Sequence, residues 1–142
     1  MEISFIIIDD NELDCFIARK IIAHTDRNIA TDVFHDAQHA LESISANTSY
    51  HPGHTTIVLL DIRMPLMNGF EFIEAFEKLS PDIHRQYKIK VLSSTRNMRD
   101  ILRLRAYRTV DGILEKPLSR EIVSRLVDDV RMGGLHIQES SF

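Results

Sequence analysis

Short, almost purely apolar runs alternate along the chain with segments whose apolar residues repeat every three or four positions. The apolar runs are typical of strands covered on both faces of a sheet, and the second pattern is typical of amphipathic helices. The predicted strands are residues 3–8, 29–34, 57–61, 89–92 and 112–114. The predicted helices cover about residues 11–24, 37–44, 72–79, 98–107 and 122–130.

Five strands that alternate with five helices predict an α/β fold with one parallel sheet and helices on both faces. Of the common doubly wound arrangements, the flavodoxin-like strand order 2-1-3-4-5 suits a sheet of five strands best. A chain of 142 residues fits a single domain. We expect this domain to cover residues 1–132, and the remaining tail, residues 133–142, is too short for a second domain.

The same pattern predicts several local details. The apolar stripe of the first predicted helix consists of Leu13, Phe16, Ile17 and Ile21. Cys15 falls within the same helical pattern, and we interpret it as a packing residue rather than a reactive thiol. The polar stretch 45–55 predicts a loop, and the helix over residues 72–79 should stop before Pro81.

Composition narrows the class of protein. The chain is 44% apolar and 27% charged, which is ordinary for a soluble globular protein. A single cysteine permits no disulfide within the chain, which suits a reducing compartment. No stretch approaches the roughly 20 apolar residues of a membrane span, and no secretory signal precedes the first strand. We therefore expect a cytoplasmic protein without a membrane partner.

The net charge of −4 disfavours general binding to nucleic acid, but the charge is unevenly distributed. Residues 96–108 contain five arginines and one aspartate, so this window carries +4 and the rest of the chain −8. Arg96, Arg99 and Arg103 recur at helical spacing within it. These arginines form either a solvated helix face or a docking patch for an acidic partner surface.

Polar side chains follow the predicted strands at the edge of the sheet where open α/β folds bind their ligands. They are Asp9, Asp10, Asp61, Ser93, Ser94 and Lys116. Three carboxylates in one crevice raise one another's pKa, and Mg²⁺ relieves this because it binds carboxylate oxygens. With Mg²⁺ bound, one carboxylate can attack phosphorus, while the lysine and a hydroxyl share the charge on the phosphoryl oxygens.

Five short segments, each at a strand end, occur in a characteristic order. They are residues 6–11, 59–65, 68–69, 91–94 and 115–118. Each segment is a weak signal alone, but the five together are specific. Over about residues 3–132 the sequence resembles the response-regulator receiver domain of two-component signalling, in its stand-alone form. The resemblance implies a phosphorylation-dependent switch that is not an enzyme beyond its own phosphorylation and dephosphorylation. Its donor would be a histidine kinase or a histidine phosphotransfer protein, and it would then contact a target protein or relay the phosphate.

The resemblance also implies a role for each acidic residue in the crevice. Asp61 matches the phospho-acceptor of the family. Asp10 matches the direct ligand of Mg²⁺, and Asp9 matches its companion that binds through water. Arg63 stands where the backbone carbonyl completes the metal shell, so its side chain is free to vary.

Further positions concern the response to phosphorylation. Ser93 matches the switch hydroxyl, and Lys116 matches the lysine that contacts the phosphoryl oxygens. The family pattern also implies a cis peptide bond before Pro117. Two features depart from the pattern: the switch hydroxyl is a serine rather than the commoner threonine, and Ile113 stands where an aromatic residue usually couples the site to the output face.

Two other functions occur on related folds and fit the sequence less well. A phosphohydrolase of the haloacid dehalogenase type needs an Asp-x-Asp arrangement after the first strand, whereas Asp9 and Asp10 are adjacent. A flavin or nucleotide carrier needs a phosphate-binding loop where residues 9–12 are mostly acidic. A relay shuttle and a terminal switch both remain open. His51 and His54 lack a third ligand nearby, so we interpret them as loop residues rather than a metal site.

Overall fold

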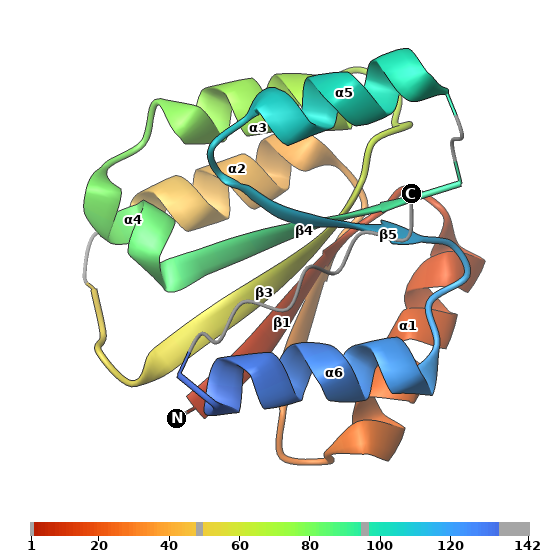
Figure 1. Ribbon diagram of the computed structural model, residues 1–142, viewed down its shortest axis with the longest axis vertical. Coiled ribbons are helices and arrows are strands. Elements are labelled where there is room, and N and C mark those ends of the chain that lie inside the picture. Colours follow the sequence, from red (N-terminus) through yellow and green to blue (C-terminus); the bar gives the residue numbers. More distant parts are fainter. Residues whose placement is uncertain (1, 48–49, 95–96, 134–142) are drawn as a thin grey trace.

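The computed structural model describes residues 2–47, 50–94 and 97–133 (Figure 1). The strands are β1 (Glu2–Ile8), β2 (Ala30–Phe34), β3 (His54–Asp61), β4 (Tyr87–Ser93) and β5 (Val110–Glu115). They form one parallel sheet in the order β2-β1-β3-β4-β5, which confirms the predicted fold class and strand order. The helices are α1 (Glu12–Thr25), α2 (Ala37–Ala46), α3 (Gly69–Glu77), α4 (Pro81–Gln86), α5 (Met98–Ala106) and α6 (Arg120–Arg131).

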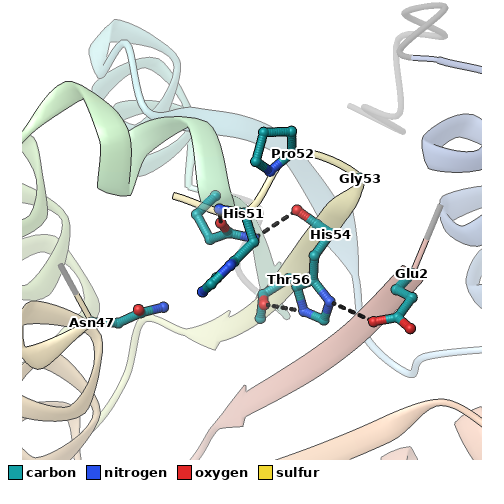
Figure 2. A pocket seen from close by; sticks show the side chains of 8 residues that line it. Glu2, Asn47, His51, Pro52, Gly53, His54 and Thr56 are labelled. Carbon is teal, nitrogen blue, oxygen red and sulfur yellow. Dashed lines mark hydrogen bonds and ion pairs between the residues drawn. The ribbon is translucent and has the colours of Figure 1, made fainter. Parts of the chain in front are cut away.

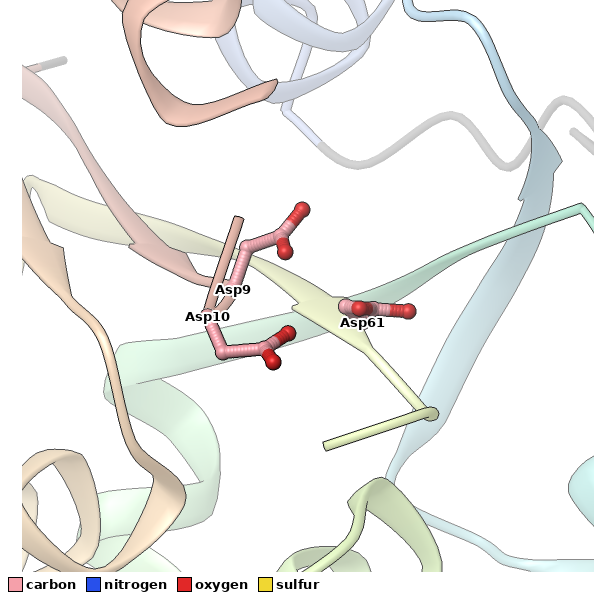
Figure 3. Close-up of side chains that lie close together, drawn as sticks. All are labelled: Asp9, Asp10 and Asp61. Carbon is pink, nitrogen blue, oxygen red and sulfur yellow. The ribbon is translucent and has the colours of Figure 1, made fainter. Parts of the chain in front are cut away.

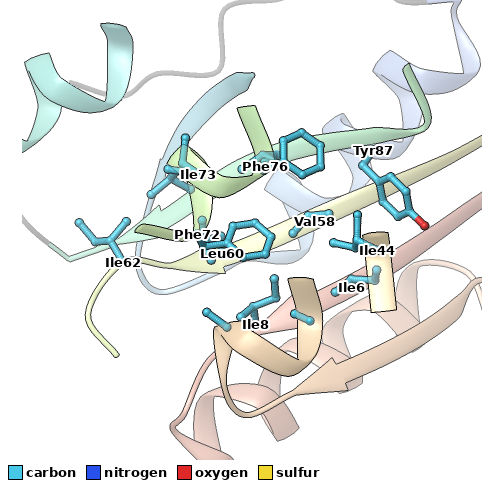
Figure 4. Packing of buried hydrophobic residues seen from close by; sticks show 14 of the residues in the cluster. Ile6, Ile8, Ile44, Val58, Leu60, Ile62, Phe72, Ile73, Phe76 and Tyr87 are labelled. Carbon is cyan, nitrogen blue, oxygen red and sulfur yellow. The ribbon is translucent and has the colours of Figure 1, made fainter. Parts of the chain in front are cut away.

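The sheet separates two hydrophobic layers because alternate side chains of each strand point to opposite faces. Ile6 and Ile8 of β1 face a core that also contains buried residues of α2, α3, α4 and α5, part of which is shown in Figure 4. Phe5 and Ile7 face the opposite core, which α1 and α6 cover. None of the described helices combines the length and apolar character that crossing a membrane requires.

Side chains cap the start of each described helix, so local sequence signals mark where these helices begin. The capping residues are Asn11, Asp36, Asn68, Ser80, Asn97 and Ser119. At α3 the loop returns closely on itself, because a Cβ atom at Gly69 would lie 2.5 Å from the Cα atom of Ile62. Only glycine fits there, and this close approach keeps the segment after Asp61 compact.

Two sequence predictions about the middle of the chain were wrong. The structure contains the additional helix α4 over Pro81–Gln86, where we expected no helix. Ser80 caps this helix and Pro81 occupies its first turn, where a proline costs no hydrogen bond. The predicted loop over residues 45–55 is also shorter, because α2 continues to Ala46 and β3 begins at His54.

Of the four residues in the apolar stripe predicted for the first helix, three are exposed, and Ile21 alone packs partly against the core. Leu13 is 65% exposed, Phe16 is 57% exposed, and Ile17 is exposed as well. The side that packs on the sheet and α6 instead consists of Cys15, Ala18 and Ile22. Burial of Cys15 agrees with its interpretation as a packing residue, but α1 presents three large apolar side chains to solvent.

Candidate functional site

Three acidic side chains meet at the carboxyl edge of the two central strands. Asp9 and Asp10 directly follow β1, and Asp61 ends the neighbouring strand β3. One oxygen from each carboxylate lies within 4.8 Å of the others. Figure 3 shows the three side chains gathered at this edge of the sheet. The backbone N–H of Asn11 donates to Asp9 Oδ1 over 3.0 Å, which orients that carboxylate. Among the described residues, this is the one group of three side chains with the spacing of a metal site.

Lys116 brings a positive charge to these acids from the end of β5. Its Nζ atom lies 3.2 Å from Asp9 Oδ2 and 3.9 Å from Asp61 Oδ2. The backbone N–H of Lys116 donates to the carbonyl of Ser93 over 2.9 Å, which ties the end of β5 to the end of β4. The peptide bond between Lys116 and Pro117 is cis, which confirms the prediction. The lysine therefore points into the crevice rather than into solvent.

A fourth carboxylate, which the sequence analysis missed, also contacts the lysine. Asp14 Oδ2 in the first turn of α1 lies 3.1 Å from Lys116 Nζ. Asn11 caps this turn by accepting a hydrogen bond from the Asp14 backbone N–H over 2.9 Å. The predicted helix over about residues 11–24 includes Asp14, but nothing in the sequence shows which way its first turn faces. Asp9, Asp10, Asp14, Asp61 and Lys116 are called the crevice cluster below.

The charges of the crevice cluster are unbalanced. Burial raises the pKa of Asp61 to about 6, and Asp9 adds to this, although Lys116 and the backbone N–H of Arg63 act in the opposite direction. The Asp61 side chain is only 11% exposed. Four carboxylates beside one ammonium suit a hard divalent cation, which binds oxygen ligands and neutralises excess negative charge. The donor set at this edge therefore fits Mg²⁺.

The two positions that were predicted to take part in switching are buried in the sheet. Ser93 is the last residue of β4 and is almost fully buried, whereas Ser94 is exposed. Ile113 lies in β5 opposite Val91 and packs into the core covered by α2, α3, α4 and α5. Ser93 thus lies at the same edge as the acids, and Ile113 lies inside the sheet behind it.

The predicted arginine face is divided by the structure. Arg96 lies outside the described residues, and Arg99 is exposed in the first turn of α5. Arg103 is engaged: its guanidinium lies 3.0 Å from Glu74 Oε2 and 4.1 Å above the ring of Phe70. Its Nε also donates to the Tyr107 hydroxyl over 3.2 Å.

Arg103 therefore joins α5 to α3 rather than extending freely towards a partner. The Tyr107 hydroxyl completes this arrangement by donating to Glu74 Oε2 over 2.5 Å. Phe70, Glu74, Arg103 and Tyr107 are called the α3–α5 network below.

A second hollow lies at the opposite end of the sheet, where the strands begin (Figure 2). It has a volume of about 440 Å³ and contains both His51 and His54. The ring of His54 is engaged on both sides, with Nδ1 3.5 Å from Glu2 Oε2 and Nε2 3.1 Å from Ser4 Oγ. These histidines do not join the crevice cluster.

Comparisons with known proteins agree on one family. The family model of the response regulator receiver domain matches residues 5–128. The autoinducer 1 sensor kinase/phosphatase LuxN of Vibrio campbellii is 29% identical over 112 residues, which are 79% of this chain but only 12% of that protein.

Solved structures extend this similarity to three dimensions. A response regulator receiver protein from Dyadobacter fermentans is 28% identical, with a TM-score of 0.79 over 89% of this chain and 95% of that one. A two component response regulator from Cytophaga hutchinsonii is 26% identical, with a TM-score of 0.76 over 92% of this chain and 98% of that one. The family match over most of the chain, supported by these structures, shows that the protein belongs to the response regulator receiver domain family, whose members act in phosphorylation-dependent signalling.

Proposed function

We propose that this protein is a signalling switch that accepts a phosphoryl group from a phosphohistidine onto Asp61 with the help of Mg²⁺. The observation that carries the proposal is the convergence of Asp9, Asp10, Asp61 and Lys116 from three strand ends in one crevice. We place the receiver domain at residues 1–132, and the phosphorylated form would act through contacts with another protein or pass the phosphate on.

The metal would be held by the carboxylates of Asp9, Asp10 and Asp61 and by the backbone carbonyl of Arg63. Bound there, Mg²⁺ supplies positive charge that neutralises the phosphoryl oxygens and the acids around them. The fit rests on the excess of carboxylates over amines in the crevice and on the raised pKa of Asp61.

The residues of this chain have separate parts in the transfer. A carboxylate oxygen of Asp61 attacks phosphorus, the bond from phosphorus to the donor imidazole nitrogen breaks, and its electron pair stays on that nitrogen. Lys116 Nζ lies 3.9 Å from Asp61 Oδ2, close enough to move onto a phosphoryl oxygen. The Ser93 hydroxyl, at the end of the adjacent strand, would donate to another. Hydrolysis by water would then restore Asp61, without turnover of any other substrate.

The surface beside the crevice suits a protein donor. Leu13, Phe16 and Ile17 form an exposed apolar stripe on α1, and Leu13 directly precedes Asp14 of the crevice cluster. A donor protein whose phosphohistidine reaches Asp61 must cover this edge of the sheet. An apolar surface on that donor, carried by a histidine kinase or a histidine phosphotransfer protein, would bury the stripe.

The output face in this proposal is formed by α5, β5 and α6. Phosphorylation would shift an existing equilibrium between two conformations, and a target protein would read this face. Ile113 is buried and has no aromatic ring to turn inward, so part of the usual coupling to this face would be missing or rerouted. Of the predicted docking arginines that lie within the described residues, Arg99 remains available to a partner, because Arg103 contacts α3.

Labelling with a small phosphodonor tests the central assignment. Wild-type protein incubated with acetyl phosphate and Mg²⁺ should gain one phosphoryl group that is stable in acid and labile in base, as an acyl phosphate is. Asp61→Asn should gain none, and Asp10→Asn should lose the dependence on Mg²⁺ together with most of the label. An unlabelled wild type, or equal labelling of Asp61→Asn, would refute the proposal.

Surface variants test the docking of the donor separately. The double variant Leu13→Ser, Phe16→Ser should slow transfer from a phosphorylated histidine phosphotransfer protein while labelling by acetyl phosphate stays unchanged. Its unfolding free energy should change by only about 0.5 kcal/mol, because the replaced side chains are exposed. Leu102→Ser on α5 is the matched control, since Leu102 is equally exposed but belongs to another helix. Equal slowing by the control would contradict docking on α1.

A further inference from the structure

Lys116 lies closer to an acid outside the proposed phosphorylation machinery than it does to the phospho-acceptor. Its Nζ atom is 3.1 Å from Asp14 Oδ2 but 3.9 Å from Asp61 Oδ2. Asp9 Oδ2, at 3.2 Å, is the other close partner. The ammonium is therefore held on the α1 side of the crevice, beyond hydrogen-bond distance from Asp61 Oδ2.

The position of Asp14 follows from the start of α1. Asn11 caps the helix, which places Asp14 in the first turn, where the helix dipole favours a negative charge. The Asp14 side chain remains 42% exposed. Because solvent reaches the pair, the contact between Asp14 and Lys116 can be broken at small cost, unlike a fully buried ion pair.

The electrostatics of Lys116 agree with this placement. Burial lowers the pKa of Lys116, but the hydrogen bond to Asp14, followed by the charges of Asp61 and Asp9, outweighs that effect and raises the pKa overall. Asp14 is thus one of the acids that favour the charged form of Lys116 in its present position.

We propose that Asp14 is a positioning residue that holds Lys116 away from Asp61 and so competes with the phosphoryl group for the lysine. The inference rests on the proposed function, because it assumes that Lys116 moves onto a phosphoryl oxygen at Asp61. When phosphoryl oxygens draw the ammonium towards β3, its contact with Asp14 is lost. Asp14 therefore lowers the stability of the phosphorylated state relative to the unphosphorylated state. The strength of the contact between Asp14 and Lys116 thus affects the fraction of the protein that is phosphorylated.

Binding of beryllofluoride, a phosphoryl analogue, in saturating Mg²⁺ measures this competition on the full 142-residue chain. Asp14→Asn should bind the analogue about two- to fivefold more tightly than wild type, the range expected for a partly exposed ion pair. Asp14→Glu, which keeps the charge, should return the affinity towards the wild-type value. Isothermal titration calorimetry measures the affinity of wild type and of each variant for beryllofluoride.

The matched control separates the specific contact from a general change of charge. Glu12→Gln removes one negative charge from the same turn of α1, and within the part of the chain that the structure describes Glu12 makes no ion pair. It should change the affinity for beryllofluoride less than Asp14→Asn does. Mg²⁺ affinity, measured alone, should not increase in Asp14→Asn, because a nearby negative charge has been removed.

The possible results separate the inference from the proposed function. Equal affinities for wild type and Asp14→Asn, or equal effects of Asp14→Asn and Glu12→Gln, would overturn the inference while the proposed function stands. Weaker binding of both Mg²⁺ and the analogue by Asp14→Asn would show that Asp14 only supports the structure of the crevice, and this would also overturn it. Failure of the wild type to bind the analogue would instead remove the proposed function itself.

Discussion

The crevice cluster and the α3–α5 network each surround one cationic side chain with acceptors, yet they differ in burial and in charge balance. In the crevice cluster, Lys116 lies within 4 Å of three carboxylates, of which Asp61 is largely buried. In the α3–α5 network, Arg103 is about half exposed and faces a single carboxylate, that of Glu74. A phenol and an aromatic ring complete its surroundings.

The pKa values of one carboxyl group in each region, Asp61 and Glu74, shift in opposite directions. Burial raises the pKa of Asp61 to about 6, although Lys116 opposes this. Hydrogen bonds from Tyr107 and Arg103 lower the pKa of Glu74. An ionised carboxylate thus costs free energy in the crevice and gains it in the network. In the network, one guanidinium balances the charge of one carboxylate, so the contact is structural. In the crevice, the carboxylates outnumber the single ammonium, so a cationic ligand can stabilise them.

Neutralising one acid in each region should change stability in opposite directions, and the crevice should show the largest effect. Because the pKa of Asp61 rises from 3.8 to about 6 on folding, its ionised form destabilises the folded protein above pH 6, and this cost vanishes below pH 3.8. Without Mg²⁺, Asp61→Asn should raise the unfolding free energy at pH 8 by roughly 2–3 kcal/mol. Urea unfolding at pH 8 and near pH 4 measures the difference, which should disappear at the lower pH.

Glu74→Gln is the matched change in the α3–α5 network. A lowered pKa means that ionised Glu74 stabilises the folded state above its unfolded pKa, and that this contribution is lost as the pH falls through the folded pKa. The variant should therefore be slightly less stable than wild type at pH 8. If Asp61→Asn also destabilised the protein, the contrast between the two regions would be wrong.

Binding of Mg²⁺ should be linked to proton release in the crevice. The metal requires ionised ligands, so below pH 6 the proton on Asp61 must leave before all three carboxylates can bind. The apparent affinity should fall by up to about tenfold for each unit of pH below 6 and level off above it. Calorimetry in two buffers with different ionisation enthalpies reports the proton directly. Proton release that persisted unchanged in Asp61→Asn would assign the linkage to another group.

Much of the fold and of the site could be predicted because both depend on strand ends. Apolar runs are bounded in the sequence, and the carboxyl ends of parallel strands share one edge of the sheet. Asp9, Asp61 and Lys116 directly follow or end such runs, so their meeting required no knowledge of side-chain directions. The predicted starts of the helices over residues 37–44 and 98–107 agree with the structure, whereas α3 begins three residues before the predicted start at residue 72.

Features that depend on the rotation of a helix could not be predicted in this way. Helix α1 carries two apolar sides, and its larger side chains, such as Phe16, suggested the wrong one. The structure buries the smaller set around Ala18, because small side chains let α1 approach the sheet and α6 closely. The contacts of Asp14 and of Arg103 depend on the same rotations. Helix α4 was missed because six mostly polar residues show too little periodicity.

A small expected effect tests whether the α3–α5 network makes the modest contribution to stability that the comparison implies. Tyr107→Phe removes only the hydroxyl that accepts from Arg103 and donates to Glu74, and the ring stays in place. Urea unfolding should show a loss of about 1 kcal/mol, because the two hydrogen bonds that are lost are both exposed to solvent and each contributes little. Tyr50→Phe, whose ring packs under Arg85 at the surface, is the matched control and should leave stability unchanged. If Tyr107→Phe lowered the unfolding free energy by as much as Asp61→Asn raises it, the two regions would affect stability equally. Burial would then not explain the difference between them.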